Sequence, residues 1–271
     1  MKKSLRENPD LEVIKKNTGS PENDSAFYLP IYANNGKYIY YLKIPELYYE
    51  NLFLEISEKG GGLWRIDLYD FSEKEILKGE YRAFDISSDN KSIVVVEGNG
   101  GIKITDTSGN ILYALETSQD SIIWVKFSHD GDKIYYAAKD SLSGYYRINL
   151  DGSEEELVRL CENPKYFDLT KDDSLYDELE YPSFNPLDDR YVIGVYSFKQ
   201  DVIETETDLI LIDRVNKDTI FLNAMPYEYT KITYPSWSPD GKDVIFSCKG
   251  VYKFNPPTEC RSEIWILKNV K

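Results

Sequence analysis

One short segment recurs along the chain, and this repeat constrains the fold more than any other feature of the sequence. Each copy has an aromatic residue or Ile, then turn-forming residues, then a β run. The copies are IYANNGKYIYY (31–41), FDISSDNKSIVVV (84–96), FSHDGDKIYYA (127–137), FNPLDDRYVIGV (184–195) and WSPDGKDVIFS (237–247). Asp and Asn side chains accept backbone hydrogen bonds and Gly adopts positive φ cheaply, so each copy predicts a β-hairpin. The strand after the turn is apolar at consecutive positions, which predicts that both of its faces are covered.

A second strand–turn–strand pattern follows four of the copies. It reads LWRIDLYDFSEKEIL (63–77), GIKITDTSGNILYAL (101–115), YYRINLDGSEEELV (145–158) and DLILIDRVNKDTIFL (208–222). Each unit therefore contains four antiparallel strands. Four-stranded units repeated every 40 to 60 residues or so predict an all-β protein with the β-propeller fold.

We predict one domain, 1–271, with five blades, and six blades as the alternative because a further strand-like run, NLFLEIS, lies at 51–57. The last unit offers only three strands, and DLEVIKKN (10–17) resembles the missing outer strand. The segment 1–18 is therefore expected to supply an outer strand to the last blade, beside 263–267, and to close the ring without an unpaired edge. The predicted blades cover about 27–79, 80–118, 122–160, 178–224, and 230–271 together with 10–17.

The S-P-D-G-K turn before an apolar strand, most complete at Ser238–Lys242, resembles the repeat of TolB-type, WD-like propellers. This repeat also occurs in the amino-terminal propellers of dipeptidyl peptidases and prolyl oligopeptidases. The resemblance covers nearly the whole chain, and the other copies depart from it at Asn34, Ser88, His129 and Leu187. TolB-type propellers usually have six blades, whereas we count five. The resemblance implies a platform that binds proteins or peptides, and it implies no catalytic residue.

Composition narrows the range of partners. Twenty-three tyrosines against two methionines favour strands, and 32 basic against 47 acidic residues give a net charge of −15, which disfavours nucleic acid. No apolar run reaches the roughly 18 residues of a membrane helix, so we expect a soluble protein without membrane insertion. No apolar stretch follows the basic start MKKSLRENPD, which predicts a cytoplasmic protein; a periplasmic or extracellular location is the alternative if a signal was removed.

Catalytic motifs are absent from the sequence. It has no G-x-S-x-G elbow and no G-K-[ST] phosphate loop, and its one histidine, His129, lies in a hairpin turn. We therefore expect no catalytic residue, no cofactor and no metal site, with Ca²⁺ near the acidic segment DLTKDDSLYDELE (168–180) as the alternative, although the EF-hand spacing is missing. Cys248 and Cys260 flank one hairpin loop and would form a disulfide in an oxidising compartment, but would stay thiols in a reducing one.

The lengths of the loops between second and third strands are uneven. They are short in units two and three (97–101 and 139–144) and long in units one, four and five (45–62, 198–207 and 249–261). Units four, five and one adjoin in a closed ring, so we predict one decorated sector that recognises a protein or peptide. The predicted binding residues on loops are Tyr48, Tyr49, Phe198, Lys199, Tyr252 and Phe254. Arg82, Trp124, Tyr181 and Tyr234, near the starts of inner strands, are expected to line the channel mouth, with packing between blades as the alternative for Trp124 and Tyr234. The alternatives are an enzyme acting on a glycan or small substrate at the channel mouth and a structural subunit of an assembly.

Overall fold

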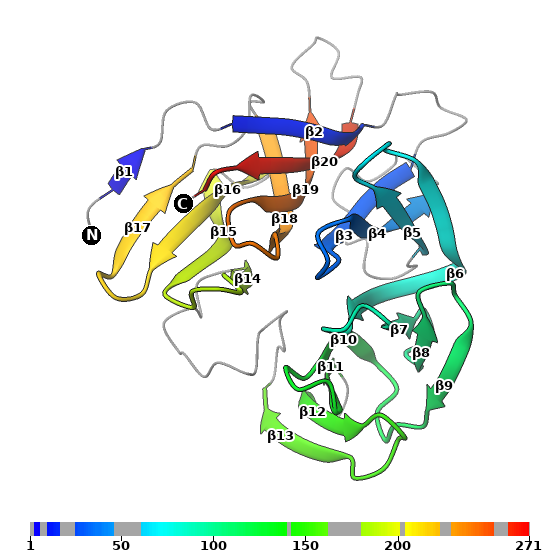
Figure 1. Cartoon of the computed structure of the whole chain (residues 1–271). Helices are drawn as coiled ribbons and strands as arrows, with labels where there is room; N and C mark the ends of the chain where they lie inside the picture. Colours follow the sequence, from blue (N-terminus) through cyan, green and yellow to red (C-terminus); the bar gives the residue numbers. More distant parts are fainter. Residues whose placement is uncertain are drawn as a thin grey trace. The chain divides into compact units, whose positions relative to one another are not determined.

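The computed structural model describes residues 3–5, 10–16, 25–45, 61–139, 142–161, 180–200, 204–222, 229–251 and 260–270 (Figure 1). Every regular element in these residues is a β-strand. Within the same ranges there is no helix of the length and apolarity that spanning a membrane requires. The prediction of an all-β protein is confirmed. The chain divides into two compact units, residues 1–32, 45–52 and 173–271 (the first unit) and residues 33–44 and 53–172 (the second unit).

The second unit contains two antiparallel sheets. In one, β4 to β9 follow one another in sequence order; in the other, β10 to β13 do the same. The strands are β4 (Tyr38–Pro45), β5 (Gly61–Asp67), β6 (Glu73–Ile86), β7 (Ser92–Glu97), β8 (Ile102–Asp106), β9 (Ile111–Leu115), β10 (Ile122–Phe127), β11 (Lys133–Ala138), β12 (Gly144–Asn149) and β13 (Glu156–Leu160). The first half of the long strand β6 pairs with β5 and its second half pairs with β7. One strand thus serves both as the outer strand of one repeat unit and as the inner strand of the next.

The first unit contains a sheet of order β1-β17-β16-β15-β14 and a sheet of order β18-β19-β20-β2. Strand β3 packs against β18, β19 and β20. The strands are β1 (Lys3–Leu5), β2 (Asp10–Lys16), β3 (Ser25–Tyr32), β14 (Glu180–Phe184), β15 (Tyr191–Gln200), β16 (Glu204–Asp213), β17 (Asp218–Phe221), β18 (Tyr229–Trp237), β19 (Val244–Val251) and β20 (Cys260–Lys268). Both units therefore contain sheets of four antiparallel strands, as the repeat predicts.

The predicted amino-terminal outer strand is present. Strand β2 pairs antiparallel with β20, with Leu11 opposite Leu267 and Val13 opposite Trp265. Glu12 forms an ion pair with Lys268, and Leu11 packs against the buried cluster of this unit. The predicted pairing is confirmed, and the outer edge of β20 is covered. Strand β1, which pairs with β17, was not expected from the sequence.

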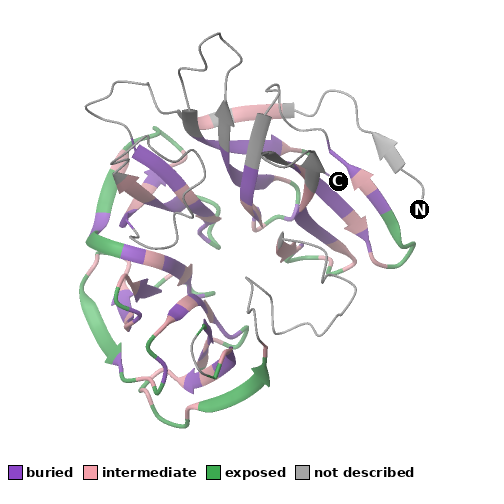
Figure 2. Ribbon diagram, turned by 180° about the vertical axis from the view of Figure 1, so that it is seen from behind, coloured by how far each residue is buried: buried purple, intermediate pink, exposed green. Residues whose placement is uncertain are grey.

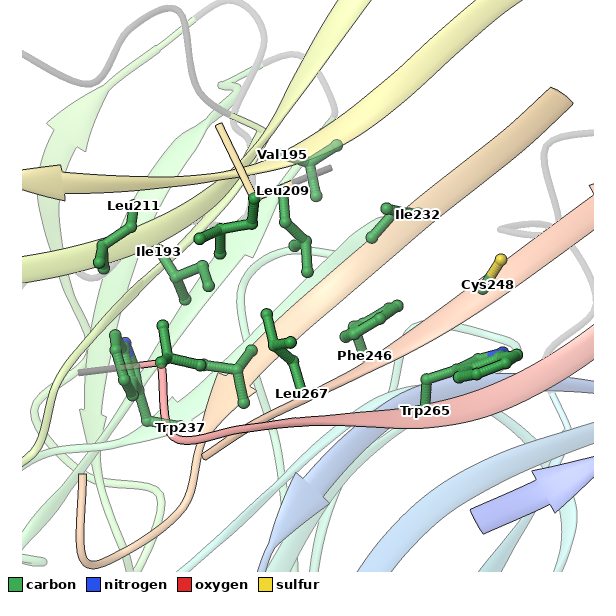
Figure 3. Close-up of a cluster of buried hydrophobic side chains, with 13 residues drawn as sticks. Ile193, Val195, Leu209, Leu211, Ile232, Trp237, Phe246, Cys248, Trp265 and Leu267 are labelled. Carbon is green, nitrogen blue, oxygen red and sulfur yellow. The ribbon is translucent and has the colours of Figure 1, made fainter. Parts of the chain in front are cut away.

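The apolar strands that follow the repeat turns form the cores of the sheets. In the first unit, Ile193, Val195, Phe246 and Leu267 belong to one buried cluster, which Trp237 and Trp265 complete at its sides (Figure 3). In the second unit, Ile93 to Val96 of β7 are fully buried. Outer strands differ: most side chains of β9 and all of those of β13 are exposed (Figure 2). The consecutive apolar positions thus mark strands covered on both faces, as predicted.

The repeat turns share one hydrogen-bond pattern. The Ser238 hydroxyl donates to Asp240 Oδ1 at 2.6 Å and accepts from the Asp243 N–H at 2.9 Å, while the Gly241 N–H donates to the Ser238 carbonyl. The turns at 87–92 and 128–133 repeat this pattern with Ser87 and Ser128. In each turn the serine hydroxyl holds the pKa of the aspartate carboxyl below its usual value. Asp and Ser are therefore needed together, which explains their recurrence in the sequence.

The predicted long loop at 198–207 is wrong. Strands β15 and β16 continue through it in register, with Phe198 opposite Glu206 and Gln200 opposite Glu204, so only residues 201–203 connect them. The polar letters ETET suggest a loop, but the β-branched threonines alternate with glutamates, and this alternation suits a strand. The connections at 46–60 and 252–259 lie outside the described residues.

Candidate binding site

The first strand of four repeat units contains a β-bulge at the same place. One extra residue lies between Tyr81 and Ala83 in β6 and between Ile122 and Trp124 in β10. The same irregularity lies between Glu180 and Ser183 in β14 and between Thr233 and Ser236 in β18. Bulges bend a strand, redirect a side chain and are common beside functional sites. The β-bulges therefore bend the starts of these inner strands and change the direction of the side chains there.

In the first unit this region also carries backbone strain. Leu29, Tyr181 and Tyr234 have φ values of 50°, 53° and 53°, and each stands directly before a proline. Such conformations of residues other than glycine cost about 1–3 kcal/mol each and persist only where the surrounding structure enforces them. Because the same strain occurs on three different strands, the fold holds this geometry at an equivalent place in each of them.

Three tyrosines meet at or next to these strained positions, and we call Tyr28, which precedes Leu29, Tyr181 and Tyr234 the tyrosine cluster. They come from β3, β14 and β18 of the first unit. The ring centroids of Tyr181 and Tyr234 lie 4.3 Å apart with the planes tilted by 48°, and Tyr28 meets Tyr234 edge to face at 6.2 Å. All three side chains are partly exposed. Clustered rings with polar hydroxyls offer an apolar surface and hydrogen-bonding groups together.

Two hydrogen bonds join the hairpin that begins with β14 to the hairpin that begins with β18. Trp237 Nε1 donates to the Ser183 carbonyl at 3.0 Å, and the buried Asn185 donates through Nδ2 to the Gly241 carbonyl at 2.7 Å. A bound partner gains affinity when the groups that it meets are already ordered. The cluster thus rests on a scaffold that is fixed before any ligand arrives.

Strands extend past the tyrosine cluster in the first unit. The β18–β19 ladder runs five residue pairs beyond its bulge, from Thr233–Ser247 to Tyr229–Val251, and β15–β16 runs five pairs beyond Val195. At about 3.3 Å per residue, these strand extensions, which we call the protruding ends, continue for roughly 16 Å. Their residues nearest the bulge are still packed in the sheet core, since Ile232, Thr233, Ser247 and Cys248 are buried. In the second unit the corresponding ladders end one pair beyond the bulge, at Tyr81–Glu97 and Ile122–Ala138. The protruding ends are residues 196–200, 204–208, 229–233, 247–251 and 260–263.

The predicted binding residues divide into three groups. Tyr48, Tyr49, Tyr252 and Phe254 lie outside the described residues. The backbone of Phe198 and Lys199 belongs to a protruding end, but their side chains lie outside the description. The remaining predicted residues, Arg82, Trp124 and Tyr181, are placed with their side chains.

The placed residues have different surroundings. Arg82 is the extra residue of the β6 bulge and is partly exposed. Trp124 is only 8% exposed and packs with Ala137 and Tyr145, so it serves the core of its sheet. Tyr181 belongs to the tyrosine cluster. Tyr28 was missed, and its signal was the Y-L-P at 28–30, a variant of the Y-P dipeptides at 181–182 and 234–235.

The alternative of a disulfide between Cys248 and Cys260 does not fit the ladder. Cys248 is buried and carries no disulfide. It stands opposite Glu263, whereas Cys260 stands opposite Val251, three pairs further along the ladder. This offset is about 10 Å along the strands, beyond the roughly 7 Å between Cα atoms that a disulfide spans.

The partly buried ion pair between Arg190 and Asp213 stabilises a turn and, within the described residues, is not part of a metal site. Arg190 binds both carboxylate oxygens of Asp213, at 2.7 and 2.5 Å, and thereby lowers the pKa of that carboxyl. Asp213 also accepts hydrogen bonds from the backbone N–H groups of Val215 and Asn216. No group of His, Cys, Asp and Glu that could hold a metal occurs in the described ranges, and the acidic segment at 168–179 lies outside them.

Comparison with protein-family models and with curated proteins finds no match. Among solved structures, TolB from Acinetobacter baumannii is 14% identical, with 90% of this chain and 55% of that chain covered and a TM-score of 0.43. A putative TolB from Agrobacterium tumefaciens is 16% identical, with 83% and 70% covered and a TM-score of 0.44. Oligogalacturonate lyase from Vibrio parahaemolyticus is 12% identical, with 90% and 78% covered and a TM-score of 0.50. The chain thus spans little more than half the length of the first of these proteins.

These likenesses concern the fold alone. Together with the sheets of four antiparallel strands, they define the chain as a β-propeller of four-stranded blades. This agrees with the propeller fold that the resemblance of the S-P-D-G-K turn implies. The number of blades stays a prediction.

Proposed function

We propose that this chain is a non-catalytic binding module that recognises a protein or peptide. The contact surface is the tyrosine cluster together with the protruding ends, on the long-loop face of the predicted blades four, five and one. The observation that carries the proposal is the meeting of three partly exposed tyrosines, two of which (Tyr181 and Tyr234) have a strained φ before a proline while the third, Tyr28, precedes the strained Leu29. Strain maintained at equivalent places on three strands points to a use for that geometry.

The chemistry of the tyrosine cluster suits protein recognition. Tyrosine is enriched at the centres of protein interfaces because it gives a large contact area at a small loss of side-chain entropy. The strand extensions next to the cluster occur in the first unit but not at β7–β8 or β11–β12. This asymmetry supports a site on the first unit, where strand extensions rather than a long loop mark the predicted blade four.

Affinity capture from a lysate of the native organism tests the proposal. The intact protein is compared with a Tyr181→Ala, Tyr234→Ala double variant and with a control, Tyr69→Ala, whose ring is 95% exposed in a turn of the second unit. Urea unfolding first establishes that all three are folded. A partner captured by the intact protein and the control, but lost from the double variant, supports the proposal. The same partner on all three proteins, or none on any, overturns it.

An enzyme acting on a glycan is the second candidate, because aromatic rings also stack on sugars and one protein of similar fold is named an oligogalacturonate lyase. That substrate is a polyanion, and a net charge of −15 disfavours its approach. Incubation with oligogalacturonate, followed by the absorbance of the unsaturated product, tests this candidate. A turnover-dependent rise would replace the binding proposal with an enzymatic one.

Three expectations from the sequence, on calcium, nucleic acid and cellular location, remain predictions, and each has a direct test. Ca²⁺ near 168–180 predicts a rise in the thermal midpoint on adding calcium that is reversed by a chelator. The absence of a nucleic-acid partner predicts no shift of labelled DNA or RNA at low salt, where basic patches bind most strongly. The cytoplasmic location predicts recovery in the cytosolic fraction on cell fractionation.

A further inference from the structure

An amino-terminal strand lies on the outer edge of a sheet in the first unit. Strand β1 pairs with β17 in parallel, with Lys3, Ser4 and Leu5 opposite Thr219, Ile220 and Phe221 (Figure 1). The other strand pairs described are antiparallel. This strand is therefore an addition to the four-stranded repeat unit β14–β17, which is complete without it.

The edge of β17 is well prepared for strand addition. Thr219 and Phe221 are 5% and 7% exposed, and the Phe221 ring meets Tyr196 edge to face at 6.0 Å. Strand β17 is thus fixed to its sheet by side chains, while the backbone groups on its outer side point away from β16. When β1 is absent, the N–H and C=O groups of this edge are unpaired and form a template for an extended segment.

The pairing of β1 is short, which makes it exchangeable. Three residue pairs in a parallel ladder provide few hydrogen bonds, and parallel pairing is the less stable kind. Only residues 6–9 separate β1 from β2, which is itself paired with β20. This short tether gives β1 a local concentration on the order of millimolar. Tethering therefore accounts for much of its occupancy, and a longer or better-matched segment can displace it.

Charge indicates which segment the edge prefers. The first six residues, MKKSLR, contain three basic and no acidic side chains, in a chain of net charge −15. The segment that occupies the edge is thus opposite in sign to the protein that receives it. Opposite charge raises the rate of encounter and favours basic segments over acidic ones.

We propose that the outer edge of β17 is a strand-acceptor site for an extended segment of a partner protein, with basic residues flanking an apolar one. Strand β1 is the built-in competitor, which the partner segment must displace. The site is separate from the tyrosine cluster, because β17 is the outer strand of its sheet and the cluster lies on inner strands. Either proposal can fail while the other stands.

A synthetic peptide of residues 1–8 is the probe for this site. It is titrated into a variant that lacks residues 1–8 and keeps β2, and into the full chain, while the amide resonances of Thr219–Phe221 are followed by NMR. We expect saturable shifts in the truncated variant and an apparent affinity at least tenfold weaker in the full chain, where β1 competes. Equal affinity in both proteins, or no shift in the truncated variant, overturns the proposal.

Two altered peptides separate backbone pairing from charge. A peptide with Ser4→Pro and Leu5→Pro lacks two adjacent N–H groups, one of which must face β17, so binding should be lost. A peptide with Lys2→Glu, Lys3→Glu and Arg6→Glu should bind at least tenfold more weakly. Retained binding of the proline peptide contradicts strand addition, and equal binding of the acidic peptide contradicts the preference for a basic partner. If the truncated variant does not fold, the full chain with Ser4→Pro and Leu5→Pro replaces it.

Discussion

Asn185 joins two neighbouring repeat hairpins of the first unit, and its replacement by alanine tests how strongly. The side chain is 1% exposed. Its Nδ2 donates to the Gly241 carbonyl at 2.7 Å, and its Oδ1 accepts the N–H groups of Leu187 and Asp188 at 3.0 and 3.2 Å. Asn34 makes a similar bond in the second unit, from Nδ2 to the Ser87 carbonyl at 3.1 Å, but it is exposed.

The two residues form a matched pair because the chemistry is shared and the burial differs. Asn185→Ala removes three hydrogen bonds and leaves the carbonyl of the buried Gly241 without its partner, so we expect a loss of about 2–4 kcal/mol in the free energy of unfolding. Asn34→Ala removes one bond whose partners water can satisfy, which predicts a loss below about 1 kcal/mol. Burial should therefore decide the difference between the two variants.

Urea unfolding followed by tryptophan fluorescence measures both effects, since Trp237 and Trp265 lie in the first unit with Asn185, and Trp64 and Trp124 lie in the second unit with Asn34. Equal slopes of free energy against urea show that the variants lose the same structure on unfolding. Losses of equal size for the two variants, or a loss below about 1 kcal/mol for Asn185→Ala, would refute the claim that the hydrogen bond from the Asn185 side chain is a major contact between the hairpins.

Three further predictions concern the turns and the amino-terminal strand. A Cβ on Gly241, at φ 67°, would lie 2.5 Å from Asn185 Oδ1, whereas one on Gly131 has 3.9 Å to Ser88; Gly241→Ala should therefore lower the urea midpoint much more than Gly131→Ala. Asp89, Asp130 and Asp240 have lowered pKa values, so their contribution to stability is present above about pH 4 and is lost as the pH falls through the folded pKa. Urea midpoints between pH 7 and pH 3 should show this loss, and Ser128→Ala should weaken it. Leu11→Ala should lower the free energy of unfolding by about 1–2 kcal/mol, less than a full core truncation because Leu11 is partly buried. The surface change Glu12→Ala should lower it by less than about 1 kcal/mol. Equal losses for the two variants in urea unfolding would contradict the packing of β2.

The sequence predicts the local features of this fold well. A Ser-x-Asp-Gly turn carries its own hydrogen bonds, so the hairpins at Ser128 and Ser238 can be recognised without any tertiary information. The β2–β20 pairing was predictable because the last unit had three strands and an unassigned strand stood at the other end of the chain. Each inference used contacts that the repeat itself defines.

Features that depend on distant contacts were harder to predict. The strained φ of Tyr181 and Tyr234 follows from a bulge in the ladder with a neighbouring strand, so the Y-P dipeptide alone does not reveal it. The pairing of β1 requires an open edge on β17, which lies more than two hundred residues away in sequence. Packing was an open alternative for Trp124 and Tyr234 at the sequence level; Trp124 packs in the core of its sheet, whereas Tyr234 belongs to the tyrosine cluster.

The most direct test of the binding proposal is the dissociation constant of a captured partner for each tyrosine variant. Calorimetric titration compares the intact protein with Tyr28→Ala, Tyr181→Ala, Tyr234→Ala and the control Tyr69→Ala, with urea midpoints measured on the same samples. A central interface tyrosine is worth about 2 kcal/mol or more, so we predict that at least one cluster variant binds roughly 30-fold more weakly, with the control unchanged. Dissociation constants that agree for all four variants and the intact protein would contradict the assignment of the tyrosine cluster as the binding site.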